Sequence, residues 1–293
     1  MKIKAPAKIN LSLDITGKRD DGYHLLWMLM QSVTCYDEIE VTRSENNGIH
    51  LTIESGDVAE ALNSDGSNLC VRAAEAMKAR FGIEGGYDIF LKKNIPLSAG
   101  LAGGSTDAAA VIRLIDRLEG LEADDGLLCK VGLSIGSDVP YCLKGGLMIA
   151  EGTGDKLTRL PELPKRYILI AKINRGLNTG EVYRKYDTLS DVIHPDNEKI
   201  EEAARAGSWE RLMPLMGNVL YKASVTMENR IGNMISDMRS SGADASMMSG
   251  SGPSVFGIFR DRKSMEDARD SLERIYPDAE FRLSETCGPL GKE

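Results

Sequence analysis

The sequence of 293 residues has no apolar run approaching the ~20 residues that a membrane-spanning helix needs. Its first residues contain neither the apolar core of a signal peptide nor a transit segment rich in arginine and serine, so we expect a cytoplasmic location. The chain also lacks a surplus of positive charge, because its formal net charge is −8. That balance argues against nucleic acid or an anionic membrane as a main partner.

Cysteine and histidine are scarce as well. The five cysteines are scattered without a C-x-x-C pair, and the three histidines show no zinc-ligand spacing. We therefore expect free thiols in a reducing compartment and no metal site built from protein side chains.

Two familiar phosphate-binding loops are absent. The P-loop requires a lysine after its last glycine, and the dinucleotide fingerprint requires the spacing G-x-G-x-x-G. A different glycine-rich segment stands in their place, and it is the most informative stretch of the chain. It consists of Pro96, Leu97, Ser98, Ala99, Gly100, Leu101, Ala102, Gly103, Gly104, Ser105 and Thr106.

Apolar residues with helical spacing follow this segment, at Ala108, Val111, Ile112 and Ile115. The pattern predicts a glycine-rich loop that opens onto a helix ending near Gly120, with Ser105 or Gly104 as its cap. Because the N-terminus of a helix carries free N–H groups and the positive end of the dipole, this is a predicted phosphate site. The alternative is a flexible turn before a core helix.

The remaining pattern predicts an α+β fold with two lobes and the ligand cleft between them. Residues 2–15 alternate strictly and predict a half-buried strand with Lys8 and Asn10 side by side on its polar face. A proline-rich stretch at 156–165 suggests domains at 1–160 and 161–293. Further strands are expected at 37–42, 50–53, 87–91, 146–150, 167–173, 255–259 and 279–283, and helices at 68–81, 123–134, 197–206, 208–217, 225–240 and 264–275.

Transfer of a phosphoryl group needs a carboxylate to orient or deprotonate the acceptor and a cation beside it. The best candidate carboxylate is Asp138, which follows a helix end among small and apolar residues; it could equally be a helix cap. Lys8 is the candidate cation, and its alternative is a solvated lysine. Asn10 is notable because asparagine is depleted in strands, and such a mismatch is typical of functional sites.

The glycine-rich segment matches the signature P-x-[small]-x-G-L-[AG]-G-G-S-[ST]-[DN]-A and resembles that of the GHMP kinases. The resemblance runs from Lys2 to about Phe259. Its other motifs are residues 5–11 (APAKINL), 17–24 (GKRDDGYH), 136–140 (GSDVP) and 249–253 (SGSGP). The first two resemble the branch of this superfamily that acts in the non-mevalonate isoprenoid pathway on a cytidine diphosphate-linked methylerythritol.

This resemblance implies roles for individual residues. Asp138 would be the base for the acceptor hydroxyl, and Lys8 would polarise it. Tyr23 and His24 would read the cytosine, and Tyr183 would close on its other face. Asn10 would contact the erythritol or its diphosphate, and Asn68 and Lys93 would contact the adenine of ATP. The 249–253 turn would lie near the phosphate loop. Mg²⁺ would be carried by the ATP phosphates.

Each of the aromatic candidates has a plain structural alternative. Tyr23 and His24 could form an amphipathic surface turn, and Tyr183 could be a helix core residue. Two other functions also stay open, namely another GHMP kinase for a small alcohol, and an inactive relative that only binds ligand and a partner protein. Oligomeric state is not indicated.

Overall fold

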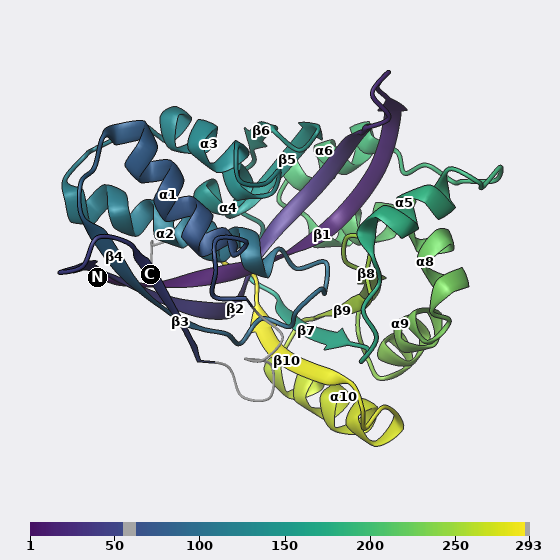
Figure 1. Ribbon diagram of the computed structural model, residues 1–293. Helices are drawn as coiled ribbons and strands as arrows, with labels where there is room; N and C mark the ends of the chain where they lie inside the picture. The colour runs from purple at the N-terminus through teal and green to yellow at the C-terminus, as the bar shows by residue number, and fades with distance from the viewer. Residues whose placement is uncertain (55–62, 291–293) are drawn as a thin grey trace.

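The structure is a computed structural model that describes residues 1–54 and 63–290. Within these residues the strands form two sheets (Figure 1). The first has the order β3 (Ile49–Glu54), β4 (Gly86–Lys92), β2 (His24–Ser44), β5 (Leu147–Gly152) and β6 (Lys156–Arg159), and β1 (Lys2–Lys18) pairs with β2. The second has the order β10 (Glu280–Glu285), β7 (Tyr167–Lys172), β9 (Ser254–Phe259) and β8 (Ala245–Met248). Only β3 and β4 are parallel among the paired strands described.

The helices divide between the two sheets. Figure 1 shows α1 to α4 gathered beside the first sheet, and α9 and α10 beside the second. They are α1 (Leu69–Phe81), α2 (Gly103–Glu119), α3 (Asp125–Leu133), α4 (Val139–Lys144), α5 (Thr179–Tyr186), α6 (Asn197–Arg205), α7 (Trp209–Leu212), α8 (Tyr221–Met227), α9 (Arg230–Ser240) and α10 (Arg262–Ile275). The prediction of an α+β fold is confirmed.

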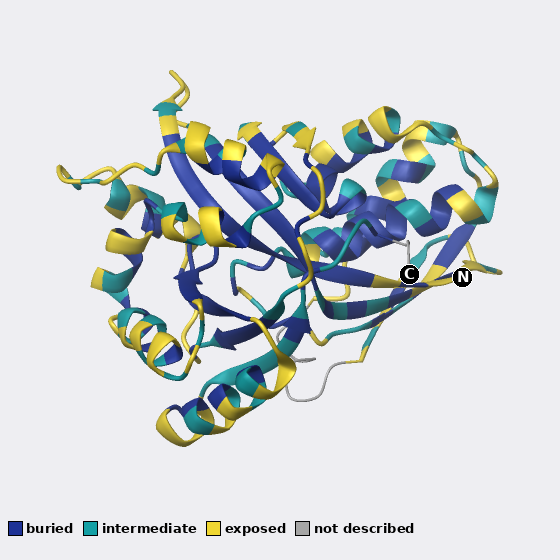
Figure 2. Cartoon of the chain, turned by 180° about the vertical axis from the view of Figure 1, so that it is seen from behind, coloured by how far each residue is buried: buried dark blue, intermediate teal, exposed yellow. Residues whose placement is uncertain are grey.

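The ends of α1 and α2 follow from their capping residues. Asn68 caps α1, since its Oδ1 accepts from the N–H of Cys70 at 2.9 Å, and Gly82 ends the helix in the left-handed conformation. Gly120 ends α2 in the same way. Figure 2 shows α2 largely buried, because its alanine and branched residues pack on all sides. Both helices confirm the sequence prediction.

The prediction of a half-buried strand for residues 2–15 is wrong, since β1 is buried on both faces from Ala5 to Ile15. The C-terminal half of the chain covers the polar face. The N–H of Asn10 donates to Ser249 Oγ at 3.3 Å, and Ser12 Oγ donates to the carbonyl of Gly217 at 3.1 Å. Alternation therefore reported two chemically different buried faces and gave no information on exposure.

Other differences lie in the C-terminal half and at the start of β2. The helix expected at 225–240 is two helices, because Glu228 is extended and its carboxylate accepts from the N–H of Arg230. The helix expected at 208–217 shrinks to α7 and a 3-10 turn at Met213–Leu215. The first half of β2, together with β6, α4, α5 and β8, was not predicted.

The two sheets do not pack as independent bodies. One hydrophobic cluster contains Ile9 and Leu29 of the first sheet together with Ile168 and Phe256 of the second. The division at residue 160 consequently stays a prediction. No helix within the described residues is long and apolar enough to cross a membrane.

Candidate active site

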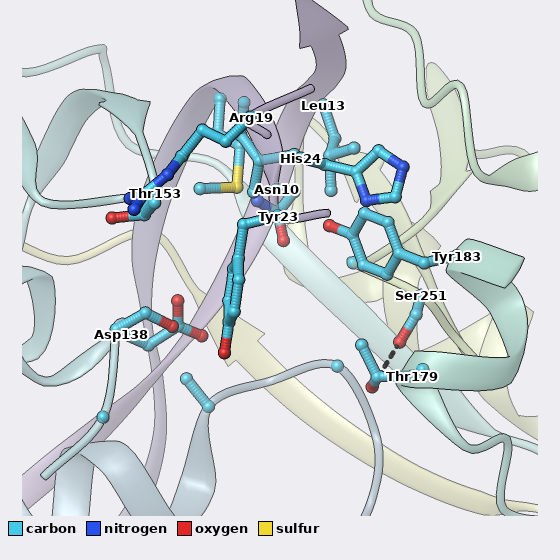
Figure 3. A pocket seen from close by; sticks show the side chains of 18 of the residues that line it. Asn10, Leu13, Arg19, Tyr23, His24, Asp138, Thr153, Thr179, Tyr183 and Ser251 are labelled. Carbon is cyan, nitrogen blue, oxygen red and sulfur yellow. Dashed lines mark hydrogen bonds between the residues drawn. The ribbon is translucent and has the colours of Figure 1, made fainter. Parts of the chain in front are cut away.

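A cavity of about 1060 Å³ lies where the first sheet, the glycine-rich loop and the C-terminal half of the chain meet. Its lining comes from β1, β2 and their connecting turn, from the glycine-rich loop, from residues 133–138, from α5 and from the 249–253 turn. Eight of the predicted site residues line it, namely Lys8, Asn10, Tyr23, His24, Gly100, Ala102, Asp138 and Tyr183. Figure 3 labels Asn10, Tyr23, His24, Asp138 and Tyr183 among them. Residues that are far apart in the sequence thus line one cavity, in agreement with the predicted ligand cleft between two lobes.

The glycine-rich loop reaches α2 through three residues in the left-handed conformation. They are Ser98 at φ 50°, Gly100 at φ 71° and Ala102 at φ 58°. Two of these are not glycine, and such conformations cluster at functional sites. Ala102, and neither Ser105 nor Gly104, is the N-cap, and no side chain caps the helix. The predicted cap was therefore wrong, and the free N–H groups of the first turn remain available to an anion.

The interior of the loop is anchored by packing. Ala99 and Leu101 are buried, and the carbonyl of Leu101 accepts from the N–H of Lys8 at 3.1 Å. A Cβ on Gly103 would lie 3.2 Å from Ile95 Cγ2 and 3.3 Å from Lys93 Nζ. Glycine at 103 is explained by this contact with protein atoms, while contact of the loop with ATP stays a prediction.

The 249–253 turn packs directly on the glycine-rich loop, as the resemblance implied. Ser249 Oγ donates to the carbonyl of Gly100 at 3.0 Å. A Cβ on Gly100 would overlap the carbonyl oxygen of Ser249, so the close approach requires glycine there. The hydroxyls of Ser251 and Thr179 are 3.0 Å apart and link this turn to α5 at the cavity wall (Figure 3).

Lys8 is a buried cation held at the cavity. Its side chain is 6% exposed, which excludes the solvated alternative. Nζ donates to Asn10 Oδ1 at 2.7 Å and to the carbonyl of Gly100 at 3.1 Å. The predicted adjacency of Lys8 and Asn10 is confirmed, and Lys8 is hydrogen-bonded to the glycine-rich loop.

Asp138 lies opposite this cation. Oδ2 of Asp138 is 4.0 Å from Lys8 Nζ, and the side chain is 32% exposed. Asp138 occupies the N-cap position of α4, yet its side chain makes no capping hydrogen bond. The carboxylate therefore faces the cavity (Figure 3), which the plain capping alternative does not explain.

An aromatic wall stands on the other side of the cavity. The rings of His24 and Tyr183 are 5.0 Å apart and tilted by 33°. Burial raises the pKa of Tyr183, and the charge of Asp138 adds to the effect, so this phenol stays protonated. Tyr23 sits in the turn between β1 and β2 and is 68% exposed, so its ring is free to meet a ligand.

Asn68 and Lys93 lie outside the cavity lining and have structural partners. Asn68 caps α1, as described above. Lys93 is buried beneath the glycine-rich loop, paired with Asp37 and, at 2.8 Å, with Asp107. The two carboxylates raise the pKa of Lys93 against the opposing effect of burial. Contact of Asn68 and Lys93 with adenine stays a prediction.

Sequence reasoning missed two charged residues of the wall, Lys18 and Asp187. Asp187 lies 2.7 Å from both His24 Nε2 and Lys18 Nζ. A signal existed, because Asp187 is four residues after Tyr183 and such pairs share one face of a helix. It went unread because α5 itself was not predicted.

Comparison with known families agrees with this geometry. The model for "GHMP kinases N terminal domain" matches residues 68–146, and the model for "GHMP kinases C terminal" matches residues 200–278. The first match contains the glycine-rich loop and Asp138. Fold and site thus define the class of ATP-dependent small-molecule kinases known as GHMP kinases.

Individual relatives are more specific. The chain is 41% identical to a 4-diphosphocytidyl-2-C-methyl-D-erythritol kinase of Clostridium beijerinckii, over 95% of this chain and 98% of the relative. It is similar to the crystal structure of a 4-(cytidine 5'-diphospho)-2C-methyl-D-erythritol kinase, with a TM-score of 0.80, 29% identity, and coverage of 98% and 100%. A homoserine kinase from Cytophaga hutchinsonii shares the fold, with a TM-score of 0.77 at 18% identity, over 98% of this chain and 94% of that one. The chain belongs to the 4-diphosphocytidyl-2-C-methyl-D-erythritol kinase family of the GHMP kinases.

Proposed function

We propose that this protein transfers the γ-phosphoryl group of ATP to a hydroxyl of 4-diphosphocytidyl-2-C-methyl-D-erythritol, in the non-mevalonate isoprenoid pathway. The observation that carries the proposal is the single cavity in which the Asp138 carboxylate, the buried Lys8 cation and the His24–Tyr183 wall meet. The Lys8–Asp138 side of the cavity supplies the groups for phosphoryl transfer, and the His24–Tyr183 side supplies a surface on which a base can stack. The names of the relatives support this acceptor.

In the proposed reaction, the hydroxyl oxygen of the acceptor molecule bonds to the γ-phosphorus of ATP. The carboxylate of Asp138 takes the proton that this hydroxyl loses. The bond from that phosphorus to the β,γ-bridging oxygen breaks, and ADP leaves. Lys8, 4.0 Å from Asp138, stabilises the negative charge that develops on the transferred group. Asn10 orients Lys8 through the 2.7 Å hydrogen bond, and we propose that it contacts the erythritol or its diphosphate.

The glycine-rich loop, residues 96–106, is proposed to hold the ATP phosphates at the N-terminus of α2. Residues 1–54 and 63–290 contain no group of three or more His, Cys, Asp or Glu side chains arranged to hold a metal. We propose that Mg²⁺ binds chiefly to ATP phosphate oxygens and water. Bound there, the ion would neutralise charge on the transferred group.

The base of the acceptor is proposed to stack between Tyr23 and Tyr183 while His24 reads its edge. Stacking on an aromatic ring contributes about 1–3 kcal/mol per base. Binding energy far from the reacting hydroxyl can position that hydroxyl against Asp138. An acceptor without the nucleotide would lose this positioning.

The test is a panel of acceptors assayed by ADP release in the presence of ATP and Mg²⁺. We expect turnover with the cytidine diphosphate-linked methylerythritol and negligible turnover with free methylerythritol, homoserine or mevalonate. Comparable kcat/KM for homoserine or mevalonate would identify a different GHMP kinase. Ligand binding without turnover of any acceptor would identify a binding protein instead, and either result contradicts the proposal.

A further inference from the structure

Three polar residues from separate elements converge at the aromatic wall. Lys18 is the last residue of β1, His24 is the first residue of β2 and its register partner, and Asp187 caps the C-terminus of α5. Asp187 Oδ1 is 2.7 Å from His24 Nε2, and Asp187 Oδ2 is 2.7 Å from Lys18 Nζ. One carboxylate thus joins the β1–β2 hairpin to α5, with each oxygen engaged by a different partner.

This arrangement determines which ring nitrogen of His24 carries a hydrogen. An ionised carboxylate only accepts hydrogen bonds, so the nitrogen facing it, Nε2, must be the donor. In a neutral imidazole the other nitrogen, Nδ1, then presents a lone pair. Lys18 keeps the Asp187 carboxylate ionised, because its hydrogen bond is the largest cause of the lowered pKa of Asp187. The hydrogen bond with His24 lowers this pKa further.

The ring has little freedom to escape this pairing. Its side chain is 11% exposed, with Tyr183 against one side and Tyr186 edge-on at 6.1 Å. His24 lines the cavity, and within the described residues its Nδ1 has no hydrogen-bond partner. A fixed, unpaired acceptor at a cavity wall is suited to a ligand that brings a donor.

We propose that Asp187 is a positioning residue that sets the choice of base, by holding His24 with its Nδ1 lone pair available to an exocyclic amino group. This inference rests on the proposed function, since it assumes that the base of the acceptor lies against the aromatic wall. Cytosine carries a 4-amino donor, and uracil carries a 4-oxo acceptor at the same position. With uracil, the 4-oxo oxygen and Nδ1 of His24 would both be acceptors, so no hydrogen bond could form between them. A site built for hydrogen bonding strongly rejects such a mismatch.

The first experiment needs no variant. Long-range ¹H–¹⁵N spectra distinguish the two neutral imidazole tautomers by the shifts of their nitrogens. At alkaline pH we expect His24 of the wild-type protein to be the Nε2–H tautomer, and its Nδ1 signal to move when cytidine 5'-diphosphate is added. A predominant Nδ1–H tautomer would overturn the inference.

The second experiment replaces Asp187 by asparagine. The amide of Asp187→Asn has the same shape and can either accept from Nε2–H or donate to Nε2, so the tautomer is no longer imposed. We expect the wild type to bind cytidine 5'-diphosphate at least ~30-fold more tightly than uridine 5'-diphosphate, and the variant to narrow that ratio at least ~10-fold. Affinity for ATP should be unchanged, and Asp187→Glu should restore part of the preference.

The matched control is Asp267→Asn, which makes the same chemical change in an exposed pair with Lys263 on α10, outside the cavity. It should leave the preference intact. The inference alone is refuted if the wild type phosphorylates the cytidine-linked acceptor but Asp187→Asn keeps both the His24 tautomer and the ratio of affinities for the two nucleotides. A wild type that does not phosphorylate that acceptor refutes the proposed function.

Discussion

The Lys8–Asp138 pair allows the proposed chemistry to be tested by a double-mutant cycle. Two unit charges at the observed 4.0 Å interact by about 4 kcal/mol at an effective dielectric constant of ~20. Asp138 is about a third exposed, so solvent lowers this figure, and ~1–3 kcal/mol is a reasonable range. The Lys8–Asp138 attraction weakens as Asp138 takes the proton, whereas a similar attraction of Lys8 for the negative charge that develops on the transferred group is lost in Lys8→Met. At 1.36 kcal/mol per tenfold change in rate, that loss should lower kcat by ~5- to ~150-fold. Asp138→Asn removes the proton acceptor and should lower kcat by ~10²- to 10⁴-fold.

The informative quantity is the double variant. If Lys8 acts through Asp138, the pair behaves as a unit and Lys8→Met adds little once Asp138 is asparagine. The assay is steady-state ADP release with the cytidine-linked acceptor, and binding of a non-hydrolysable ATP analogue checks that the variants remain folded. Rate losses that simply multiply would show that the two residues act independently. Near-normal kcat in Asp138→Asn would remove the base assignment altogether.

Three further predictions concern the surroundings of the site. Gly100→Ala should destabilise the protein more than Gly82→Ala and raise KM for ATP, because both glycines have positive φ but only position 100 faces the backbone of the 249–253 turn; equal urea midpoints would contradict this. Lys93→Met should lower the free energy of unfolding by about 3–5 kcal/mol, since two buried carboxylates lose their cation, and the deficit should shrink as pH falls and Asp107 protonates, because burial raises the pKa of that carboxyl. Burial raises the pKa of the Cys35 thiol from 9.0 to about 12. The neutral thiol therefore contributes fully to the free energy of unfolding below pH 9, and this contribution is lost between pH 9 and 12. In urea titrations from pH 8 to pH 10, the free energy of unfolding should fall by about 1.4 kcal/mol more in the wild type than in Cys35→Ala.

Local signals predicted the elements whose ends are determined by their own residues. Asn68 and Gly82 bracket α1, and Gly120 ends α2, because capping depends on atoms within a few positions of the helix end. The start of β2 carries no such signal. Its residues Leu25–Met30 form an unbroken apolar run, which a buried strand and a buried helix share. Pairing with both β1 and β5 makes it a strand.

The site divides along the same line. Lys8 and Asn10 could be placed together because they are two positions apart on one strand, and Asp138 could be proposed because the motif around it is recognisable. Their distance could not be predicted, since it depends on how β1 and α4 pack. The spacing of Asp187 from Tyr183 hinted at a shared helix face, but the contact of Asp187 with His24, 163 positions away, could not be predicted.

Asn10 shows why a conflict between local preference and pattern is informative even when the interpretation of exposure is wrong. Alternation predicted that Asn10 lies on the polar face of a half-buried strand, and its low strand propensity marked it as notable there. In the structure Asn10 is fully buried, so its amide must be satisfied by protein or by a ligand. Its Oδ1 accepts from Lys8, whereas its Nδ2 has no partner among the described residues. A buried amide donor beside the candidate catalytic cation therefore lacks an acceptor. The burial that overturned the strand prediction thus strengthens the argument for Asn10 as a binding residue.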